Sequence, residues 1–503
     1  MVTGDRIPVP EGISLRVLNA LRGRKNLWRF VSRFCRGAED AGGSTFLVGG
    51  IVRDLIEGRP GKDVDLMVTG IGFEALGDLV RNLPQNPLGI RRIVEAGKRF
   101  AVYKVFVSWS REEIDVALAR SERSTGPGHR QFEVRTDGVD AREDASRRDF
   151  TINSLMVSFR TAGNRVTGEV IDFFGGMQDL RSKRIRGVGN PRDRIREDPL
   201  RMLRAIRQKN ERSGYVIERR TWQAIRREAK ELIGTISDER LVGELGKSLT
   251  ANPSGTVSDL YRAGILAALL PEIPDWGSGA LSRMKKRYAL LERSLGSPLP
   301  ETLLFANLLV DVAWDEARLA VEKTRNDPRK RGRAPAAEIG RNALHLPRTS
   351  ALARRLHFPR LRKVVRIVED MTRLSHVRRL RNPNARIEAI FAGWEEPDHL
   401  DAFYTAARKA AGRKIEDFRQ VLTAAAKRPP LLAGDQILAL GVPAGPQVEA
   451  ILEEVREATL TGRISGRKEA LELAAFLCGG SVVPPQRGRK SRRRVSKSPA
   501  SAR

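Results

Sequence analysis

Hydrophobic residues in the first third of the chain come in short runs, which are typical of β-strands. Each run is bounded by glycine, proline or charged residues, and the runs lie at Phe46–Val48, Val64–Val68, Ala101–Val107 and Ile114–Leu118. Short apolar segments with such boundaries indicate strands rather than helices. From Thr45 to about Ser158 we therefore expect a small domain of mixed strands and helices.

Beyond Asp172 the hydrophobic period changes to that of α-helices. Helix-start signals stand at Asp198-Pro199 and at Ser237-Asp238-Glu239. The segments with helical periodicity are Leu200–Arg207, Trp222–Leu232, Arg240–Leu249 and Val257–Leu270. The pattern predicts an α+β chain, in which a small mixed sheet is followed by a long all-α region.

The C-terminal part repeats the helical pattern. Val448, Ile451, Leu452 and Val455 stand at positions i, i+3, i+4 and i+7, so one helix face would be apolar. We expect Leu431–Cys478 to form a compact helical unit.

Charge changes this picture, because the chain has 91 Lys and Arg against 61 Asp and Glu, a formal net charge of +30. Such a surplus attracts polyanions such as RNA. The alternative is a basic surface that serves solubility alone. Basic residues are dense in a candidate linker at Asn326–Thr349, in the helical stretch Leu352–Arg381 and in the tail beyond Pro484, which we expect to be disordered.

Cysteine and hydropathy limit the class of protein. Cys35 and Cys478 are the chain's two cysteines, so no disulfide framework or cysteine metal cluster is expected, and a reducing, cytoplasmic setting is the simpler interpretation. No apolar run is long enough for a membrane span. Ile13–Arg33 is basic and somewhat amphipathic, but a surface helix is favoured over a transit peptide.

Two neighbouring segments carry the densest candidate chemistry. Phe46–Asp54 predicts a strand that ends at Gly49-Gly50 and a helix that begins near Ile51. Paired glycines let a triphosphate approach the backbone, and a helix N-terminus offers donors to it. Arg53 would add a charge-assisted contact to a phosphate oxygen.

Asp63 and Asp65 stand two apart on the next predicted strand, so both side chains leave the same face. This spacing suits the paired divalent cations of two-metal phosphoryl transfer. Asp115, in a later strand, would complete the set of carboxylates, with Glu113 as a weaker substitute. An isolated pair of this kind is usually a surface feature; the paired glycines upstream favour the metal interpretation.

The motifs together resemble those of class II tRNA nucleotidyltransferases and bacterial poly(A) polymerases. They are Leu47–Asp54 with Asp63 and Asp65, then Arg147–Leu155, then Arg196–Arg204, in that family's order. The resemblance implies a polymerase-β-like catalytic head, magnesium ions at Asp63 and Asp65, and selection of CTP and ATP by protein side chains. The end of the third motif departs from the family, with Gln208-Lys209-Asn210 in place of Phe and small residues.

The resemblance also implies further nucleotide contacts and a domain plan. Arg148 and Asp149 would contact the ribose and phosphates, Asp198 and Arg201 would read the base edge, and Asn153 and Arg204 would also bind the nucleotide. Asp198 and Arg201 stand three apart and would share one helix face, where a carboxylate and a guanidinium can imitate a complementary base edge; a helix cap is the alternative for Asp198-Pro199. The expected segments are an N-terminal extension (1–25), the head (26–165), a neck (166–250), a body (251–425), a tRNA-binding tail (426–480) and a disordered basic tail (481–503).

Two further segments fit the family's pattern. Asp172–Leu180 resembles its hinge, whose glycines would permit rotation of the head, although an ordinary turn is nearly as plausible. Ser237–Lys247 resembles the last neck motif, and we expect a capped helix that braces the nucleotide-binding helix. The five histidines, at 129, 345, 357, 376 and 399, form no pair suited to a phosphohydrolase site.

Three functions remain open. Gly189–Pro191 and the basic tail resemble poly(A) polymerases, whereas Asp115–Ser124, Gly434–Pro446 and Leu460–Ser465 resemble CCA-adding enzymes. We favour addition of CCA, or of a CC or A subset, to a tRNA 3′ end over poly(A) synthesis. A non-catalytic RNA-binding protein is disfavoured because the Asp63/Asp65 pair is intact.

Overall fold

The computed structural model describes two compact units, Met1–Leu281 and Ser282–Arg503, which are treated separately below. In the first unit it describes residues 6–281 except 62, 97–101, 112, 125–131, 164, 233–234 and 274–278. In the second it describes 282–326, 349, 351, 354, 364–365, 367–368, 402–406, 409, 431–442, 445, 447–448, 451–452, 454–455, 458, 464 and 466–478.

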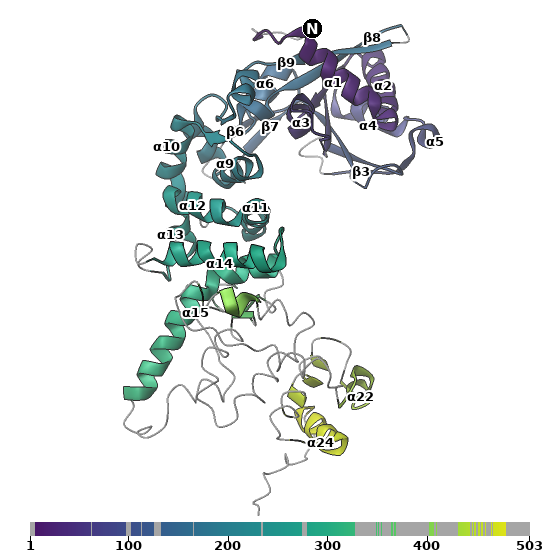
Figure 1. The fold of residues 1–503 in the computed structure, drawn as a ribbon. Coiled ribbons are helices and arrows are strands. Elements are labelled where there is room, and N and C mark those ends of the chain that lie inside the picture. Colours follow the sequence, from purple (N-terminus) through teal and green to yellow (C-terminus); the bar gives the residue numbers. More distant parts are fainter. Residues whose placement is uncertain are drawn as a thin grey trace, which may run out of the picture. The chain divides into compact units, whose positions relative to one another are not determined.

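The first unit is built on a seven-stranded mixed sheet with the order β3-β4-β5-β2-β1-β8-β9 (Figure 1). Only β2 and β5 run parallel to each other; the other neighbouring strands are antiparallel. The strands are β1 Ser44–Val48, β2 Val64–Thr69, β3 Ile90–Glu95, β4 Val102–Val107, β5 Ile114–Leu118, β8 Met156–Ala162 and β9 Arg165–Ile171. The four predicted strands are thus confirmed within the described residues, as is the mixed α+β class.

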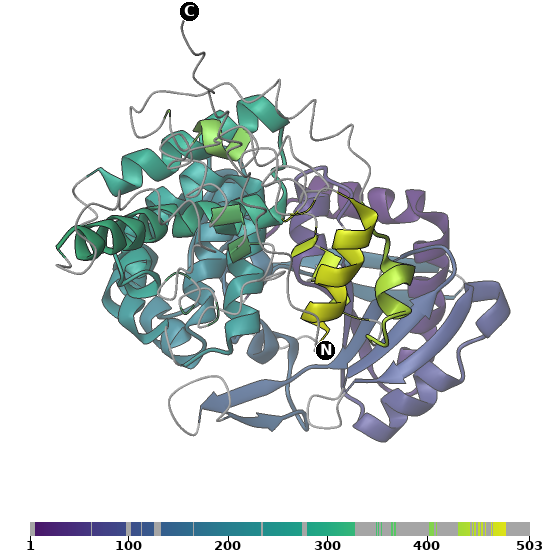
Figure 2. The same cartoon turned by 90° about the horizontal axis from the view of Figure 1, so that it is seen from below.

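Helices cover both faces of this sheet. On one face, α1 packs on β9 and α2 packs on β1 and β8, with α4 against α2; Figures 1 and 2 show these purple helices together on one side of the strands. Helix α6 lies with the side chains of the opposite face, in a core that includes Phe46, Met67 and Ala145. The helices are α1 Glu11–Gly23, α2 Lys25–Asp40, α3 Gly50–Ile56, α4 Phe73–Arg81, α5 Gln85–Leu88 and α6 Ala141–Ser146.

The remainder of the first unit is mostly helical, as predicted. It contains a short parallel ladder of two strands, β10 and β11. Its elements are α7 Gly176–Arg181, β10 Arg184–Ile185, α8 Pro191–Glu197, α9 Leu200–Glu211, β11 Val216–Ile217, α10 Arg219–Glu228, the 3-10 helix η3 Ala229–Leu232, α11 Asp238–Ala251, α12 Pro253–Ala263 and α13 Ile265–Leu269. A further two-stranded ribbon consists of β6 Ser121–Ser124 and β7 Phe132–Arg135.

One predicted helical segment is divided in two. Val257–Leu270 is helical as predicted, but α12 ends at Ala263 and α13 begins at Ile265. Gly264 lies between them with φ +81°, in the left-handed region. A residue in that conformation ends an α-helix, and glycine adopts it without a steric penalty.

The second unit contains α14 (Ala280–Leu295, which begins just before the unit boundary), α15 (Glu301–Asn326), α22 (Gly434–Leu438) and α24 (Arg467–Leu477). Arg287 of α14 is fully buried and forms an ion pair of 2.6 Å with Asp311 of α15. Val448, Ile451, Leu452 and Val455 all contribute to one hydrophobic cluster with Leu432 and Leu473. The apolar face predicted from their spacing is therefore confirmed.

Several predictions fall outside the described residues. They concern the five histidines, the disordered tail beyond Pro484, and most of the segments Asn326–Thr349 and Leu352–Arg381. Among the described helices, none is both long enough and apolar enough to cross a membrane.

Candidate active site

The two acidic residues predicted to bind metal lie at the start of β2, in the middle of the sheet. Asp65 is paired in register with Val48, the last residue of β1, and with Asp115 of the parallel strand β5. Asp63 is exposed and stands just before β2. Strand geometry therefore brings Asp115 beside Asp65, as the sequence predicted.

Gly49 forms a tight turn directly against Asp65. Its φ is +84°, and a Cβ atom placed there would lie 2.7 Å from Asp65 Oδ2. Any other residue would thus meet both backbone strain and a clash with the carboxylate. The next residue, Gly50, opens α3, one position earlier than the predicted start near Ile51.

Burial raises the pKa of Asp65 to about 6; Arg148 opposes the rise, and Asp115 and Asp63 add to it. Carboxylates that repel one another in this way are relieved by a bound cation, and their oxygens are the donors that Mg²⁺ prefers. The residues present therefore fit a divalent ion. Within the described residues, however, no three acidic, His or Cys side chains converge closely enough to form a complete metal cluster.

Asp115 differs from the other predicted site residues in its surroundings. Its carboxylate lies 3.3 Å from Lys104 Nζ, which also binds Glu113 at 2.6 Å, and it is not among the residues that line the adjacent cavity. The catalytic role predicted for Asp115 stays a prediction, and Glu113 faces the same lysine.

A cavity of about 880 Å³, which we name the catalytic cavity, opens in front of Asp63 and Asp65. Its walls come from α3, the start of β2, the segment around Arg147, and the helices α9 and α11. Except for Asp115, it brings together the predicted site residues: Gly49, Gly50, Arg53, Asp63, Asp65, Arg148, Asp149, Asn153, Asp198, Arg201 and Arg204.

Asp149 of the cavity accepts hydrogen bonds on both of its carboxylate oxygens. Its Oδ1 accepts hydrogen bonds of 2.8 Å from the Phe150 backbone N–H and from Asn153 Nδ2, and its Oδ2 accepts one of 2.8 Å from Arg204 Nε. Burial alone would raise the pKa of Asp149, but Arg204 and Asn153 outweigh burial and lower it to about 2. Asp149 is therefore an ionised link between the sheet domain and α9.

Arg53 is buried, and its guanidinium is already engaged. Its Nε and Nη2 donate to Asp54 Oδ1 at 3.0 and 2.9 Å, and its Nη1 donates to Asn153. Burial, together with the nearby charge of Arg212, lowers the pKa of Arg53. Arg53 lines the cavity, but these contacts make it a brace of α3; the phosphate contact predicted for it stays a prediction.

Arg148 is oriented by a carboxylate beneath the cavity wall. Asp144, whose side chain is 1% exposed, pairs with Arg148 at 2.8 Å and with Arg147 at 2.7 Å. Burial opposes ionisation of Asp144, but the two arginines dominate and hold its pKa below the ordinary value. The guanidinium of Arg148 is thus fixed before any ligand binds.

The geometry expected for Asp198 and Arg201 is wrong, although both residues line the cavity. Asp198 has extended backbone and precedes α9, so the two do not share a helix face. Its carboxylate accepts from Leu200 N–H at 3.2 Å and pairs with Arg240 at 2.8 Å. Arg201 Nη2 donates to the Arg147 carbonyl at 2.8 Å, because the residue faces back towards the sheet domain.

Helix α11 braces α9, as expected for Ser237–Lys247. The two helices pack against each other. Glu244 of α11 forms ion pairs with two arginines of α9: its Oε1 lies 3.3 Å from Arg204 Nη1, and its Oε2 lies 3.0 Å from Arg207 Nε. These pairs fix the helix that carries the predicted base-reading residues.

Several lining residues were missed by sequence reasoning. Asp54 pairs with Arg212 at 2.9 Å across 158 positions of sequence, for which no local signal exists. Arg147, Arg207 and Gln208 stand inside or directly beside the motifs, so their helical spacing from Arg204 and their proximity to Arg148 could have indicated them. Near the end of α9, where Gln208-Lys209-Asn210 departs from the family, Lys209 Nζ lies 2.6 Å from the buried Asp259.

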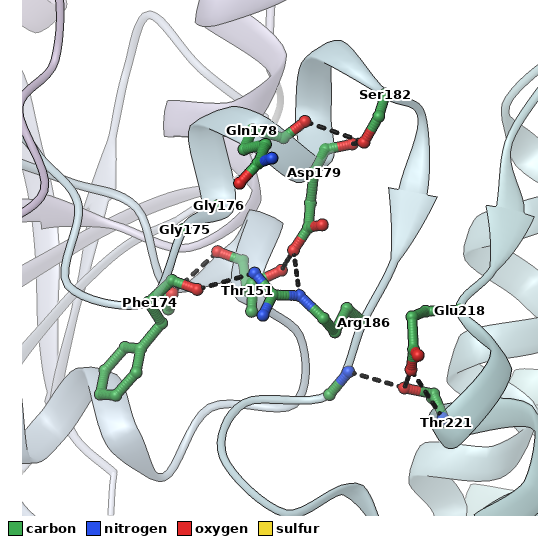
Figure 3. Close-up of polar contacts among 12 residues, drawn as sticks. Thr151, Phe174, Gly175, Gly176, Gln178, Asp179, Ser182, Arg186, Glu218 and Thr221 are labelled. Carbon is green, nitrogen blue, oxygen red and sulfur yellow. Dashed lines mark hydrogen bonds and ion pairs between the residues drawn. The ribbon is translucent and has the colours of Figure 1, made fainter.

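The segment predicted as a hinge is a tightly hydrogen-bonded turn. Asp172 accepts the backbone N–H groups of Phe174, Gly175, Gly176 and Met177 at 2.8–3.1 Å. Figure 3 shows Asp179 between Thr151 Oγ1 and Arg186 Nε, each 2.6 Å from its Oδ2. Rotation about this turn stays a prediction.

Comparison with known proteins agrees with this site. Residues 45–186 match the poly A polymerase head domain, and residues 214–276 match a family described as the probable RNA and SrmB-binding site of polymerase A. A CCA-adding enzyme of Bacillus velezensis is 34% identical over 230 residues, or 46% of this chain and 52% of the relative. The chain thus spans about half the length of that relative. The CCA-adding enzyme of Bacillus subtilis is 28% identical over 446 residues, or 88% of this chain and 96% of the relative.

Solved structures share the fold at lower identity. A CCA-adding enzyme in complex with ATP has a TM-score of 0.57 and 20% identity, with 91% of this chain and 95% of that chain covered. The Thermotoga maritima CCA-adding enzyme complexed with tRNA has a TM-score of 0.54 and 20% identity, covering 92% and 98%. The chain is thus similar to polymerase A over the head domain and the segment 214–276, and to CCA-adding enzymes over most of its length, and it shares the fold of the solved CCA-adding enzymes.

Proposed function

We propose that this protein adds CMP and AMP to the 3′ end of tRNA from CTP and ATP, without a template and with release of pyrophosphate. The product is CCA, or a CC or A subset of it. One observation carries the proposal: Asp65 lies against the Gly49 turn, and together with Asp63 it lines a cavity that also holds arginines from the sheet domain and from α9. Relatives named CCA-adding enzymes match 86–88% of the chain, which supports this product.

Magnesium would be held by Asp63 and Asp65, with Asp115 as a neighbouring carboxylate. When bound, the ions would supply Lewis-acid stabilisation of charge on the phosphoryl oxygens and on the entering and leaving oxygens. The fit of the site is chemical, since the buried carboxyl of Asp65 has its pKa raised by burial and by Asp115 and Asp63. A cation would favour its ionised form.

The protein's own side chains would bind and align the two substrates. The Gly49-Gly50 turn leaves room for the triphosphate, and Arg148, fixed by Asp144, would bind its oxygens. Asp149, Asn153 and Arg204 would position the ribose. The RNA 3′-hydroxyl oxygen then attacks the α-phosphorus in line and its proton passes to solvent, while a new P–O bond forms and the bond to pyrophosphate breaks.

Base selection would fall to Asp198 and Arg201 at the far end of the cavity. A carboxylate accepts from an exocyclic amino group, and a guanidinium donates to ring nitrogen or oxygen. The ion pair of Asp198 with Arg240 and the hydrogen bond from Arg201 to the Arg147 carbonyl would keep these groups in place. Preorganised polar groups of this kind reject a nucleotide that leaves them unpaired.

Poly(A) synthesis is the second candidate. It is favoured by the two matched segments, whose descriptions name polymerase A. The test offers purified protein a tRNA that lacks its CCA end, with CTP and ATP separately and together. Incorporation of C followed by one A supports the first candidate, whereas long A tracts from ATP alone, with CTP ignored, support the second.

Asp65→Ala tests the site itself. Nucleotide incorporation should fall by at least a thousandfold, because the metal-binding pair is lost, while RNA binding should remain. Asp78→Ala is the matched control, since Asp78 is an exposed acid of α4 that pairs with Arg81. Unchanged incorporation by Asp65→Ala would contradict the metal assignment.

A further inference from the structure

A second cavity, of about 790 Å³, lies on the helical part of the first unit, and we name it the arginine cavity. It shares no lining residue with the catalytic cavity. Five arginines from β10, α8, α10 and the segment after β10 line it: Arg184, Arg186, Arg192, Arg220 and Arg227. The function proposed above leaves these side chains without a role.

Two of the arginines are held in place by carboxylates. Arg186 donates to Asp179 at 2.6 Å and to the Phe174 carbonyl at 3.0 Å, as Figure 3 shows. Arg192 pairs with the buried Glu228 at 2.6 Å. Their side chains are still 38% and 44% exposed, so each guanidinium presents an ordered positive charge to solvent.

The other three arginines, Arg184, Arg220 and Arg227, are exposed. None of them has a carboxylate partner among the residues that the structure describes. The two acids of the cavity are already engaged and pair with none of these three: Asp179 accepts from Thr151 and Arg186, and Glu218 accepts from the first turn of α10. The arginine cavity therefore carries a surplus of positive charge.

The backbone donors near the cavity are also taken. The N–H groups of Arg220 and Thr221 donate to Glu218 at 2.9 Å, and that of Arg192 donates to Asn190 at 3.1 Å. Thr221 Oγ1 in turn accepts the Gly187 N–H at 3.0 Å (Figure 3). A pocket for a free phosphate usually offers such donors. Arginine side chains that neutralise phosphates supply much of the affinity of surfaces that follow a nucleic-acid backbone.

We propose that the arginine cavity binds backbone phosphates of the RNA substrate, away from the 3′ end that enters the catalytic cavity. The inference rests on the proposed function, because it takes RNA as the substrate. It extends the matched RNA-binding segment, residues 214–276, to Arg184, Arg186 and Arg192, which precede it. An RNA held at this site would be bound independently of its sequence.

The test compares the wild type with the triple variant Arg184→Gln, Arg220→Gln, Arg227→Gln. RNA affinity is measured by fluorescence anisotropy at several salt concentrations, with tRNA that lacks its CCA end. Each lost phosphate contact lowers the slope of log affinity against log salt by about 0.7–0.9. The variant should therefore bind RNA more weakly at low salt, with a slope smaller by roughly 2.

Two controls isolate the position of the charges. The triple variant Arg16→Gln, Arg91→Gln, Arg111→Gln removes the same charge from exposed positions outside both cavities and should keep the wild-type slope. The lysine variant Arg184→Lys, Arg220→Lys, Arg227→Lys should have nearly the wild-type slope, because the slope depends on charge. Equal losses in the two glutamine triples would overturn the proposal, since net charge alone would explain them.

Inorganic pyrophosphate, titrated by calorimetry at constant ionic strength, distinguishes the source of phosphate. A glutamine triple that loses pyrophosphate affinity but keeps the wild-type RNA slope would assign the cavity to a free anion and overturn the RNA proposal. An unchanged slope with unchanged pyrophosphate affinity would also overturn it. A failure of the proposed function can be told apart from a failure of this proposal. If the wild type adds no nucleotide to RNA, the slope of log RNA affinity against log salt can still be measured.

Discussion

Asp144 lies beneath the wall of the catalytic cavity and orients two consecutive arginines, Arg147 and Arg148. It also accepts a hydrogen bond from the Arg120 backbone N–H at 3.2 Å. A buried carboxylate with several donors contributes mainly by leaving no charge unpaired. At the scale of single residues, the cavity is therefore preorganised by acids that need not touch the substrate.

Asp144→Asn tests this interpretation. Loss of the charge leaves two guanidiniums without a buried partner, and we expect the free energy of unfolding to fall by about 3 kcal/mol. The affinity for CTP and ATP should fall as well, because Arg148 is no longer held. The pKa of Asp144 is lower in the folded protein than in the unfolded chain. Its contribution to stability is therefore complete above the ordinary carboxyl pKa, and it is lost as the pH falls from there through the lower folded pKa.

Urea denaturation and nucleotide titration measure the two effects. Asp78→Asn is the control, because its pair with Arg81 is exposed on both sides and should change stability by less than about 0.5 kcal/mol. Equal effects of the two substitutions would contradict the structural role given to Asp144.

Sequence reasoning found the residues of this site better than it found their contacts. Asp63, Asp65 and the paired glycines could be identified because strand alternation and glycine geometry are local properties. The bracing of Arg53 could not, because Asp54 is also held by Arg212, 158 positions away. Gln208 is buried, and its side-chain oxygen has no partner among the described residues, which the helical period cannot reveal.

At the scale of elements, hydrophobic period predicted strands well and helix ends poorly. Short apolar runs indicated β1 and β2, which are buried on both faces, as well as β4 and β5, in which buried and half-buried residues alternate. Val257–Leu270 kept a helical period across Gly264, so only a backbone torsion separates α12 from α13. The spacing of hydrophobic residues indicates which face of a helix is buried. It does not change when one residue between two helices adopts a left-handed conformation.

A pair of glycine substitutions tests the break between α12 and α13. A Cβ at Gly264 would meet no atom within 4 Å, so its φ of +81° is the main obstacle. Gly264→Ala should destabilise the protein by about 1 kcal/mol. Gly243 is exposed within α11 and equally uncrowded, and Gly243→Ala should stabilise by roughly 0.5–1 kcal/mol.

Thermal unfolding of the two variants gives the comparison. The midpoint should fall for Gly264→Ala and rise for Gly243→Ala. A rise for both would mean that α12 and α13 join into one helix without cost, and the left-handed residue would then not be needed.

At the scale of the whole molecule, nucleotide binding is expected to be confined to the first unit, whereas RNA affinity is expected to come from the basic segments of the second unit as well as from the arginine cavity. Every residue that lines the catalytic cavity lies between Gly49 and Lys247, inside the first unit. The strongly basic segments Leu352–Arg381 and the tail beyond Pro484 belong to the second. This division could be predicted from the order of motifs and from charge.

A fragment of residues 1–279, which ends before α14, tests the division. Because the complete wall of the catalytic cavity is retained, the fragment should bind ATP and CTP with dissociation constants within about threefold of the whole chain, which is less than 1 kcal/mol. Its RNA affinity should be much weaker and should depend less steeply on salt, since all the basic segments of the second unit are missing. Calorimetry and anisotropy measure the two affinities, and circular dichroism confirms that the fragment is folded. A folded fragment that binds no nucleotide would mean that residues beyond 279 complete the site, and the first unit could not then be regarded as the catalytic one.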